Sequence, residues 1–148
     1  MVLADSYATV GPAGPPRLLA MHEKLAVISM RQFAQEYVAD TILDSTPLEV
    51  RSEAVDMIGG MTIANYLETS ASILSADITP LLAYIQCPVL VLVGQADRRT
   101  PVLVAQALAR AVQGAELAIV PNAGHLGVLD NPSAFNGAVQ RFLTEAKS

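Results

Sequence analysis

Cysteine, tryptophan and charged residues are scarce in this 148-residue chain, which has one cysteine, no tryptophan and 16% charged residues. The single cysteine, Cys87, cannot form an internal disulfide, which fits a reducing cytosol, and we interpret it as a small buried apolar residue. Aromatic residues make up 5% of the sequence, so no platform for stacking bases is visible. The formal net charge of −5 argues against binding to nucleic acid or to an anionic membrane surface.

Long apolar runs are missing as well. No run approaches the ~18 residues that a membrane-spanning helix needs. The opening residues, Met1 to Asp5, lack the basic start and apolar core of a signal peptide. We therefore expect a cytoplasmic protein without a membrane partner. At 52% hydrophobic, the composition excludes a disordered tail and predicts one domain with a buried core.

One stretch in the second half of the chain has the pattern of a βαβ unit. Pro88 to Val93 form an uninterrupted apolar run, typical of a strand buried on both faces of a parallel sheet. Thr100 and Pro101 predict the N-cap and first position of a helix over 102–112. A second strand is predicted over 116–120, and the crossover between such parallel strands is right-handed.

An aspartate and a histidine follow the two strands of this unit. Asp97 lies in the loop after the first strand, and His125 lies in the loop after the second, behind Gly124, which permits a tight turn. The carboxyl ends of parallel strands meet at one edge, where open α/β sheets bind ligands, so we expect the two side chains to be neighbours. An aspartate that orients a histidine base supplies two parts of a hydrolytic triad. The alternative is that Asp97 only closes a turn and His125 is an ordinary loop histidine.

These motifs resemble the C-terminal end of the α/β-hydrolase family. The resemblance is carried by CPVLVLVGQADRRTP (Cys87 to Pro101), AELAIVPNAGH (Ala115 to His125) and a final helix over 132–143. It implies a partial α/β-hydrolase fold, in which C-terminal parallel strands with crossover helices are joined to a helical cap. It further implies that Asp97 is the triad acid and His125 the triad base. Enol-lactonases and related small-ester hydrolases are the nearest resemblance, which implies a small ester or lactone as substrate and no cofactor.

The nucleophile motif of that family, G-x-S-x-G, does not occur in these 148 residues. The opening MVLADSYA looks like the strand that follows the nucleophile helix, so we expect the chain to begin halfway through the fold. We therefore expect the chain alone to be inactive as a serine hydrolase. Two further hypotheses stay open. The chain is a half-fold that binds a partner or forms homo-oligomers through exposed sheet edges, or it is a truncated gene product.

The rest of the sequence predicts three regions, which are a strand of the core sheet in 1–8, a helical cap or lid in 9–80 and a βαβα part in 81–148. Within the helical region, apolar spacing predicts helices over 17–42, with a bend near 30–32, and over 47–57 and 61–73. Four methionines of this region line either an acyl pocket or an ordinary helix–helix core. They are Met21, Met30, Met57 and Met61.

Several other polar residues are candidates for a role near the site. Asp5 ends the first strand and is the competing triad acid, whereas Ser6 lacks the flanking glycines of a nucleophile elbow and is interpreted as a structural hydroxyl. Arg98 and Arg99 are either exposed charges or groups that steer a carboxylated substrate. His22 is interpreted as an ordinary helix residue. With two histidines far apart and no third ligand, we predict no metal site.

Overall fold

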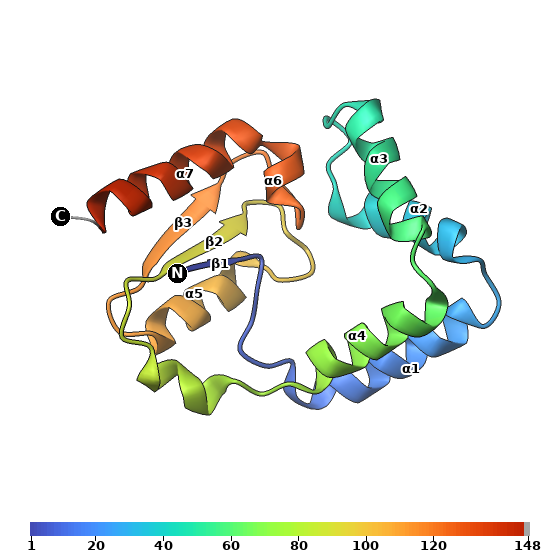
Figure 1. Cartoon of the computed structure of the whole chain (residues 1–148), viewed down its shortest axis with the longest axis horizontal. Helices are drawn as coiled ribbons and strands as arrows, with labels where there is room; N and C mark the ends of the chain where they lie inside the picture. The colour runs from blue at the N-terminus through green and yellow to red at the C-terminus, as the bar shows by residue number, and fades with distance from the viewer. Residues whose placement is uncertain (147–148) are drawn as a thin grey trace. The chain divides into compact units, whose positions relative to one another are not determined.

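The structure is a computed structural model that describes residues 1–146 and divides into two compact units (Figure 1). The first unit contains Met1–Tyr7, Thr41–Thr46 and the chain from Thr79 onward. The second unit contains Ala8–Asp40 and Pro47–Ile78. Most of the predicted helical region, 9–80, therefore lies in the second unit, whereas Thr41–Thr46, Thr79 and Pro80 belong to the unit that holds the sheet.

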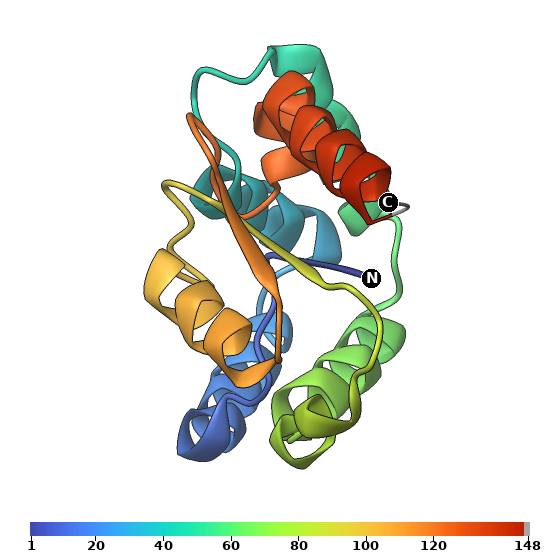
Figure 2. The same cartoon turned by 90° about the vertical axis from the view of Figure 1, so that its left-hand side faces the viewer.

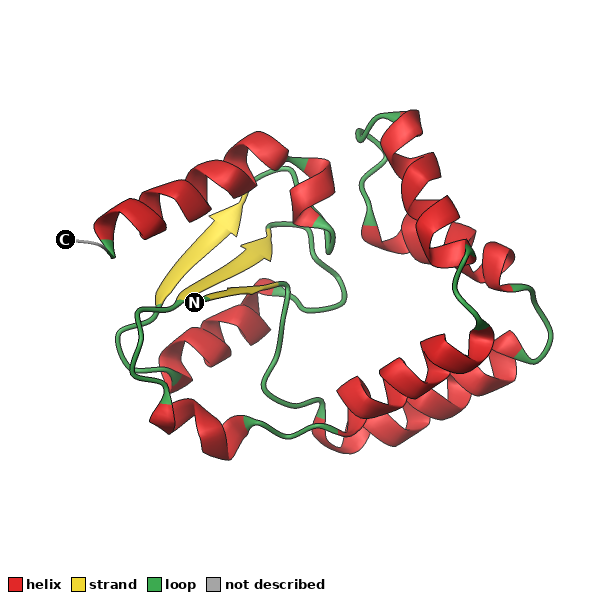
Figure 3. Ribbon diagram, viewed as in Figure 1, coloured by secondary structure: helices red, strands yellow, loops and turns green. Residues whose placement is uncertain are grey.

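A three-stranded parallel sheet with the strand order β1-β2-β3 lies at the centre of the first unit (Figure 3). Its strands are β1 (Val2–Ala4), β2 (Leu90–Gly94) and β3 (Glu116–Val120). Leu90 pairs with Val2 on one side and with Glu116 on the other. Because all three strands run in the same direction, their carboxyl ends share one edge of the sheet, and this confirms the predicted α/β class.

The central strand β2 is buried along its whole length because a helix covers each face of the sheet (Figure 2). The helix α5 (Val102–Ala111) packs on one face, and α7 (Pro132–Glu145) packs on the other. On the α7 side, Leu90 and Leu92 form a buried cluster with Ala138 and Phe142. A strand enclosed in this way has no solvent face, which is why its sequence is continuously apolar.

Short helical turns connect these elements. The 3-10 helix η2 (Thr79–Tyr84) precedes β2, and α6 (Gly127–Asp130) stands between β3 and α7. The interpretation of Cys87 as a buried residue is wrong, since its side chain is exposed. It lies in the connection between η2 and β2, before the strand begins at Leu90.

The second unit is helical throughout its regular structure. It contains the 3-10 helix η1 (Gly11–Ala13), α1 (Gly14–Leu25), most of α2 (Met30–Thr41), α3 (Leu48–Gly59) and α4 (Ile63–Ser75). The helical stretch predicted over 17–42 is two helices, and the break falls over 26–29, just before the predicted bend near 30–32.

A small apolar cluster holds these helices together. Leu25, Met30 and Phe33 are its buried residues, and the rings of Phe33 and Tyr66 meet edge to face with centroids 5.0 Å apart. Met21 packs at its margin, so two of the four methionines belong to a helix–helix core. The other two, Met57 and Met61, are 75% and 40% exposed. Among residues 1–146, no helix combines the length and apolarity required to cross a bilayer.

Candidate active site

Two loops at the carboxyl edge of the sheet bring together the side chains of Asp97 and His125. Asp97 lies in the loop between β2 and α5, and His125 lies in the loop between β3 and α6. Nδ1 of His125 is 2.9 Å from Oδ2 of Asp97. This distance is that of a charge-assisted hydrogen bond, and it follows directly from the parallel direction of the two strands.

The carboxylate of Asp97 uses its two oxygens for different purposes. Oδ1 accepts the backbone N–H groups of Arg99 (2.7 Å) and Thr100 (2.9 Å), which closes the turn after β2. Oδ2 accepts the hydroxyl of Thr100 (2.6 Å) and faces the imidazole of His125. Asp97 is therefore a turn residue and a partner of the histidine at the same time, and the turn fixes the direction in which Oδ2 points.

The electrostatics of the pair fix the position of its hydrogen. Burial raises the pKa of Asp97, but the hydrogen bonds from His125 and Thr100 outweigh this effect and lower the pKa to about 2. Near neutral pH the carboxylate is ionised and can only accept, so Nδ1 of His125 carries the hydrogen of this contact. The side chain of Asp97 is fully buried, whereas that of His125 is 18% exposed, which leaves the imidazole within reach of a reactant.

Thr100 is a member of the site that the sequence reasoning missed. The prediction that Thr100 caps a helix is wrong, because α5 begins at Val102 and Pro101 occupies its N-cap position. The hydroxyl of Thr100 donates to Asp97 instead, a carboxylate being a strong acceptor, and it also lies 3.3 Å from Nδ1 of His125. The signal in the sequence was the threonine three residues after the aspartate.

The histidine loop needs glycine at Gly124 for a reason other than the predicted tight turn. The left-handed residue of this loop is Asn122, with φ of 51°. At Gly124 a Cβ atom would lie 2.6 Å from the carbonyl oxygen of Thr41, closer than real Cβ contacts allow. The same carbonyl accepts the N–H of His125 (2.9 Å). Close approach of two backbone segments, rather than φ, therefore requires a glycine before the histidine.

Asp5 lies at the same edge but has different partners. Its Oδ1 accepts the N–H of Gly94 (3.1 Å), and it also receives a hydrogen bond from the backbone of Gly127. Burial raises the pKa of Asp5 to about 6 against the lowering effect of the Gly94 N–H, and the charge of Asp97 adds to the increase. The carboxylate that contacts Nδ1 of His125 is that of Asp97.

The remaining candidates from the sequence are all at least partly exposed. Ser6 is partly exposed in the segment after β1, and Arg98 and Arg99 are exposed in the loop that holds Asp97. His22 is exposed on α1. Within the part of the chain that the structure describes, no three histidine, cysteine, aspartate or glutamate side chains gather as metal ligands.

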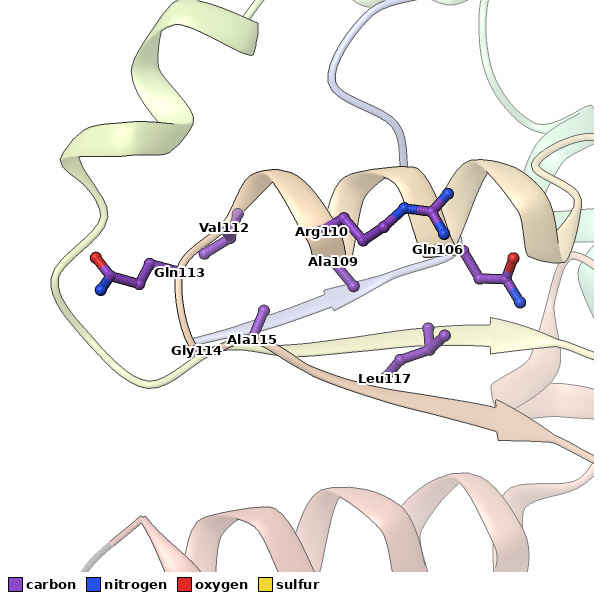
Figure 4. A pocket seen from close by; sticks show the side chains of 8 residues that line it. All are labelled: Gln106, Ala109, Arg110, Val112, Gln113, Gly114, Ala115 and Leu117. Atoms are coloured by element: carbon purple, nitrogen blue, oxygen red, sulfur yellow. The ribbon is translucent and has the colours of Figure 1, made fainter.

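A surface hollow in the first unit lies away from the histidine pair (Figure 4). It lies where α5 ends and β3 begins, and its lining includes Gln106, Arg110 and Leu117. This is the amino end of β3, whereas Asp97 and His125 follow the carboxyl ends of their strands. The hollow therefore belongs to the opposite edge of the sheet.

Comparison with known proteins places the chain in a family. Residues 76–148 match the family model described as TAP-like protein. A relative from Caulobacter sp. (strain K31), named Putative carbamate hydrolase RutD, is 34% identical over 109 residues, which are 73% of this chain and 40% of that protein. The chain belongs to the α/β-hydrolase family. The predicted family is thereby confirmed.

Solved structures show the same fold. The thermophilic esterase from Thermogutta terrifontis matches with a TM-score of 0.86 and 24% identity, over 99% of this chain and 56% of that one. The enol-lactonase from Burkholderia xenovorans LB400 matches with a TM-score of 0.82 and 23% identity, over 97% of this chain and 55% of that one. This α/β-hydrolase chain thus has a partial α/β-hydrolase fold, which spans 40% of the curated relative and a little over half of each solved structure.

Proposed function

We propose that this α/β-hydrolase chain supplies the acid–base pair for hydrolysis of a small ester or lactone, with His125 as general base and Asp97 as triad acid. The observation that carries the proposal is the 2.9 Å contact between Nδ1 of His125 and the buried carboxylate of Asp97 at the ligand-binding edge of a parallel sheet. The names of the similar proteins support the reaction class. A carbamate hydrolase, an esterase and an enol-lactonase all act at an acyl carbonyl.

The proposed reaction uses both nitrogen atoms of the imidazole. As a hydroxyl nucleophile attacks the carbonyl carbon, its proton passes to Nε2 of His125, and Asp97 stabilises the imidazolium that forms through Nδ1–H. His125 then returns the proton to the leaving alkoxide. A water molecule repeats the sequence and releases the acid. Because these 148 residues hold no G-x-S-x-G, we assign the nucleophile to a segment outside this sequence.

Two substitutions test the roles of the pair in a complete hydrolase that contains this sequence. Asp97→Asn and His125→Ala should each lower kcat for p-nitrophenyl butyrate by roughly 10³- to 10⁴-fold while KM changes little, because both residues act on the transition state. His22→Ala, at an exposed position of α1, is the control and should leave kcat unchanged. A wild-type kcat in either variant of the pair would refute the assignment.

The chain by itself allows a second test of the same proposal. Without a nucleophile elbow it should hydrolyse no p-nitrophenyl butyrate beyond the rate of free imidazole, and a fluorophosphonate should label no residue specifically. Nitrogen-15 NMR of the imidazole should show hydrogen on Nδ1, the atom that faces Asp97. Specific labelling would show that a nucleophile lies within the chain and would overturn this assignment.

A second candidate function is assembly through β1, which pairs only with β2 in the described sheet. On either side of β1, the carbonyl of Met1 accepts the N–H of Leu90 and the N–H of Asp5 donates to the carbonyl of Leu92, so the backbone of these two residues faces β2. The backbone groups of Val2 and Ala4 therefore point the other way, as alternation along a strand requires, and offer donors and acceptors to a further strand. We propose that a second copy of the chain pairs with this edge.

Sedimentation tests this second candidate. The chain should form a dimer or larger species at low micromolar concentration, and Ala4→Pro should weaken the association, since proline removes an outward N–H and leaves the bonds to β2 intact. A monomer that unfolds cooperatively at the same concentration would rule out the proposed assembly.

A further inference from the structure

A single carboxylate, that of Asp130, connects two segments that are far apart in the sequence. Asp130 is the last residue of α6 and accepts three hydrogen bonds. Its Oδ2 accepts the N–H of Gly124 (2.6 Å), directly before His125. Its Oδ1 accepts the N–H of Leu43 (2.9 Å) and the hydroxyl of Thr46 (2.5 Å). The two oxygens therefore face different partners, one in the histidine loop and one in the segment Thr41–Thr46, which we call the strap.

The strap also contacts the histidine loop without the help of Asp130. The carbonyl of Thr41 accepts the N–H of His125 at 2.9 Å and that of Leu126 at 3.4 Å. Thr41 and Thr46, at the two ends of the strap, are 2% and 4% exposed. Because both ends of the strap are buried, a donor that loses its acceptor there cannot easily bind solvent instead. The strap therefore fixes the backbone on which the histidine is carried.

We propose that Asp130 is a positioning residue for His125 and that it acts by holding the histidine loop against the strap. The proposal rests on the proposed function of His125 as general base. Asp130 touches neither the imidazole nor a reactant in this role. It fixes the amide next to the histidine, and the histidine loop in turn aims Nδ1 at Oδ2 of Asp97.

The chemistry of Asp130→Asn makes the role testable. An asparagine has one acceptor oxygen, whereas the native carboxylate faces donors on two sides. If the amide oxygen faces the strap, the NH₂ group opposes the N–H of Gly124. If the oxygen faces Gly124, the NH₂ group opposes the N–H of Leu43. Either orientation leaves a donor without its acceptor and frees one side of the histidine loop.

The first measurement uses the chain alone and does not depend on catalysis. In Asp130→Asn, amide hydrogen exchange at Gly124 and His125 should speed up at least tenfold, and the Nδ1–H signal of His125 should broaden. Asp130→Glu keeps two acceptor oxygens and should restore most of the protection. Thr46→Val removes only one of the three hydrogen bonds and should give a smaller effect. Wild-type exchange and an unchanged Nδ1–H signal in Asp130→Asn would overturn the proposal.

The second measurement uses a complete hydrolase that contains this sequence. A misplacement of about 1 Å at a reacting group costs on the order of 10²-fold in rate, so kcat for p-nitrophenyl butyrate should fall by about that factor in Asp130→Asn, with KM nearly unchanged. Thr62→Ala is the matched control, because it removes the N-cap hydrogen bond of α4 (3.2 Å to Asn65) and destabilises a helix of the other unit. An equal loss of kcat in this control would assign Asp130 a merely structural role and overturn the proposal.

The two measurements separate failure of this inference from failure of the proposed function. If His125→Ala leaves kcat unchanged, the proposed function fails, and hydrogen exchange still decides whether Asp130 holds the loop. If His125→Ala abolishes activity and Asp130→Asn alters neither exchange nor kcat, the inference about Asp130 alone is refuted.

Discussion

Alanine at Gly94 would place a methyl group against the backbone of the histidine loop. A Cβ atom at this position would lie 2.6 Å from the carbonyl oxygen of Ala123 and 2.9 Å from its carbonyl carbon, and closer still to the carbonyl oxygen of Gly124. Ordinary contacts begin at 3.4 Å. The loop or the end of β2 must therefore shift by about 1 Å or more, and β2 is buried along its whole length.

The size of the effect follows from the type of atom that must move. A flexible side chain could swing away, but the atoms in question are backbone carbonyls, and the carbonyl of Ala123 also accepts the N–H of Ala96 (2.8 Å). We therefore expect Gly94→Ala to cost about 3 kcal/mol, the upper part of the range for overpacking. With a urea m-value of about 2 kcal/mol/M, the midpoint of unfolding should fall by about 1.5 M.

Gly137→Ala provides a control of opposite sign for this measurement. Gly137 lies inside α7, where a Cβ atom would have ordinary space, its nearest neighbour being the end of the Arg141 side chain at 3.8 Å. Alanine should stabilise the helix by about 0.5–1 kcal/mol. Urea unfolding followed by far-UV circular dichroism measures both variants, and amide exchange in β2 assigns the change to the sheet. Equal midpoints for Gly94→Ala and the wild type would refute the close approach that the structure shows.

Three further perturbations follow from the same packing and charges. Because the pKa of Asp5 is raised to about 6 in the folded chain, the stabilising effect of its protonated form is complete below pH 4 and disappears as the pH rises through 6. This dependence amounts to about 1 kcal/mol after solvent screening. Urea unfolding between pH 4 and 7 should show it in the wild type and not in Asp5→Asn. Phe142→Ala should lower the free energy of unfolding by about 3–5 kcal/mol because Phe142 is 3% exposed. Leu143→Ala, at a 49% exposed position, should change it by less than about 1 kcal/mol. Similar values for the two variants would contradict the assignment of the core. Gly14→Ala should cost about 2 kcal/mol, because its Cβ atom would collide with the carbonyl of Leu74, and circular dichroism that shows no loss of helix stability would argue against the close packing of α1 on α4.

The fold was predictable where local pattern and tertiary burial agree. The apolar run before Gly94 was found because its composition reflects enclosure on both faces of a parallel sheet. The strand over 116–120 is largely exposed and was found from its place after the crossover helix. The exposure of Cys87 was not predictable in the same way, since Cys87 lies in a connection and local composition does not show which connecting residues stay at the surface. The short helix α6 was also missed, because four residues carry too little periodicity to reveal a helix.

The site was predictable to the extent that topology alone fixes it. Parallel strands bring Asp97 and His125 to one edge, and the sequence order of the two loops was enough to pair them. The contributions of Thr41 and Asp130 were not accessible from the sequence. Their contacts with the histidine loop join segments that are distant in the chain. A threonine at the end of a helix, or an aspartate shortly before a helix that begins with proline, commonly makes local hydrogen bonds instead, so neither residue type indicates such a contact. Catalytic roles for the pair stay a prediction.

The order of the strands also has a consequence for how the chain folds. β2 and β3 are joined by a single crossover helix, whereas β1 and β2 are separated by the whole second unit. Closing the longer loop costs about 1 kcal/mol more in chain entropy, so β2 and β3 should pair first and β1 should join after the transition state. Destabilising substitutions in β1 should then speed unfolding and leave the folding rate nearly unchanged, while substitutions between β2 and α7 should slow folding.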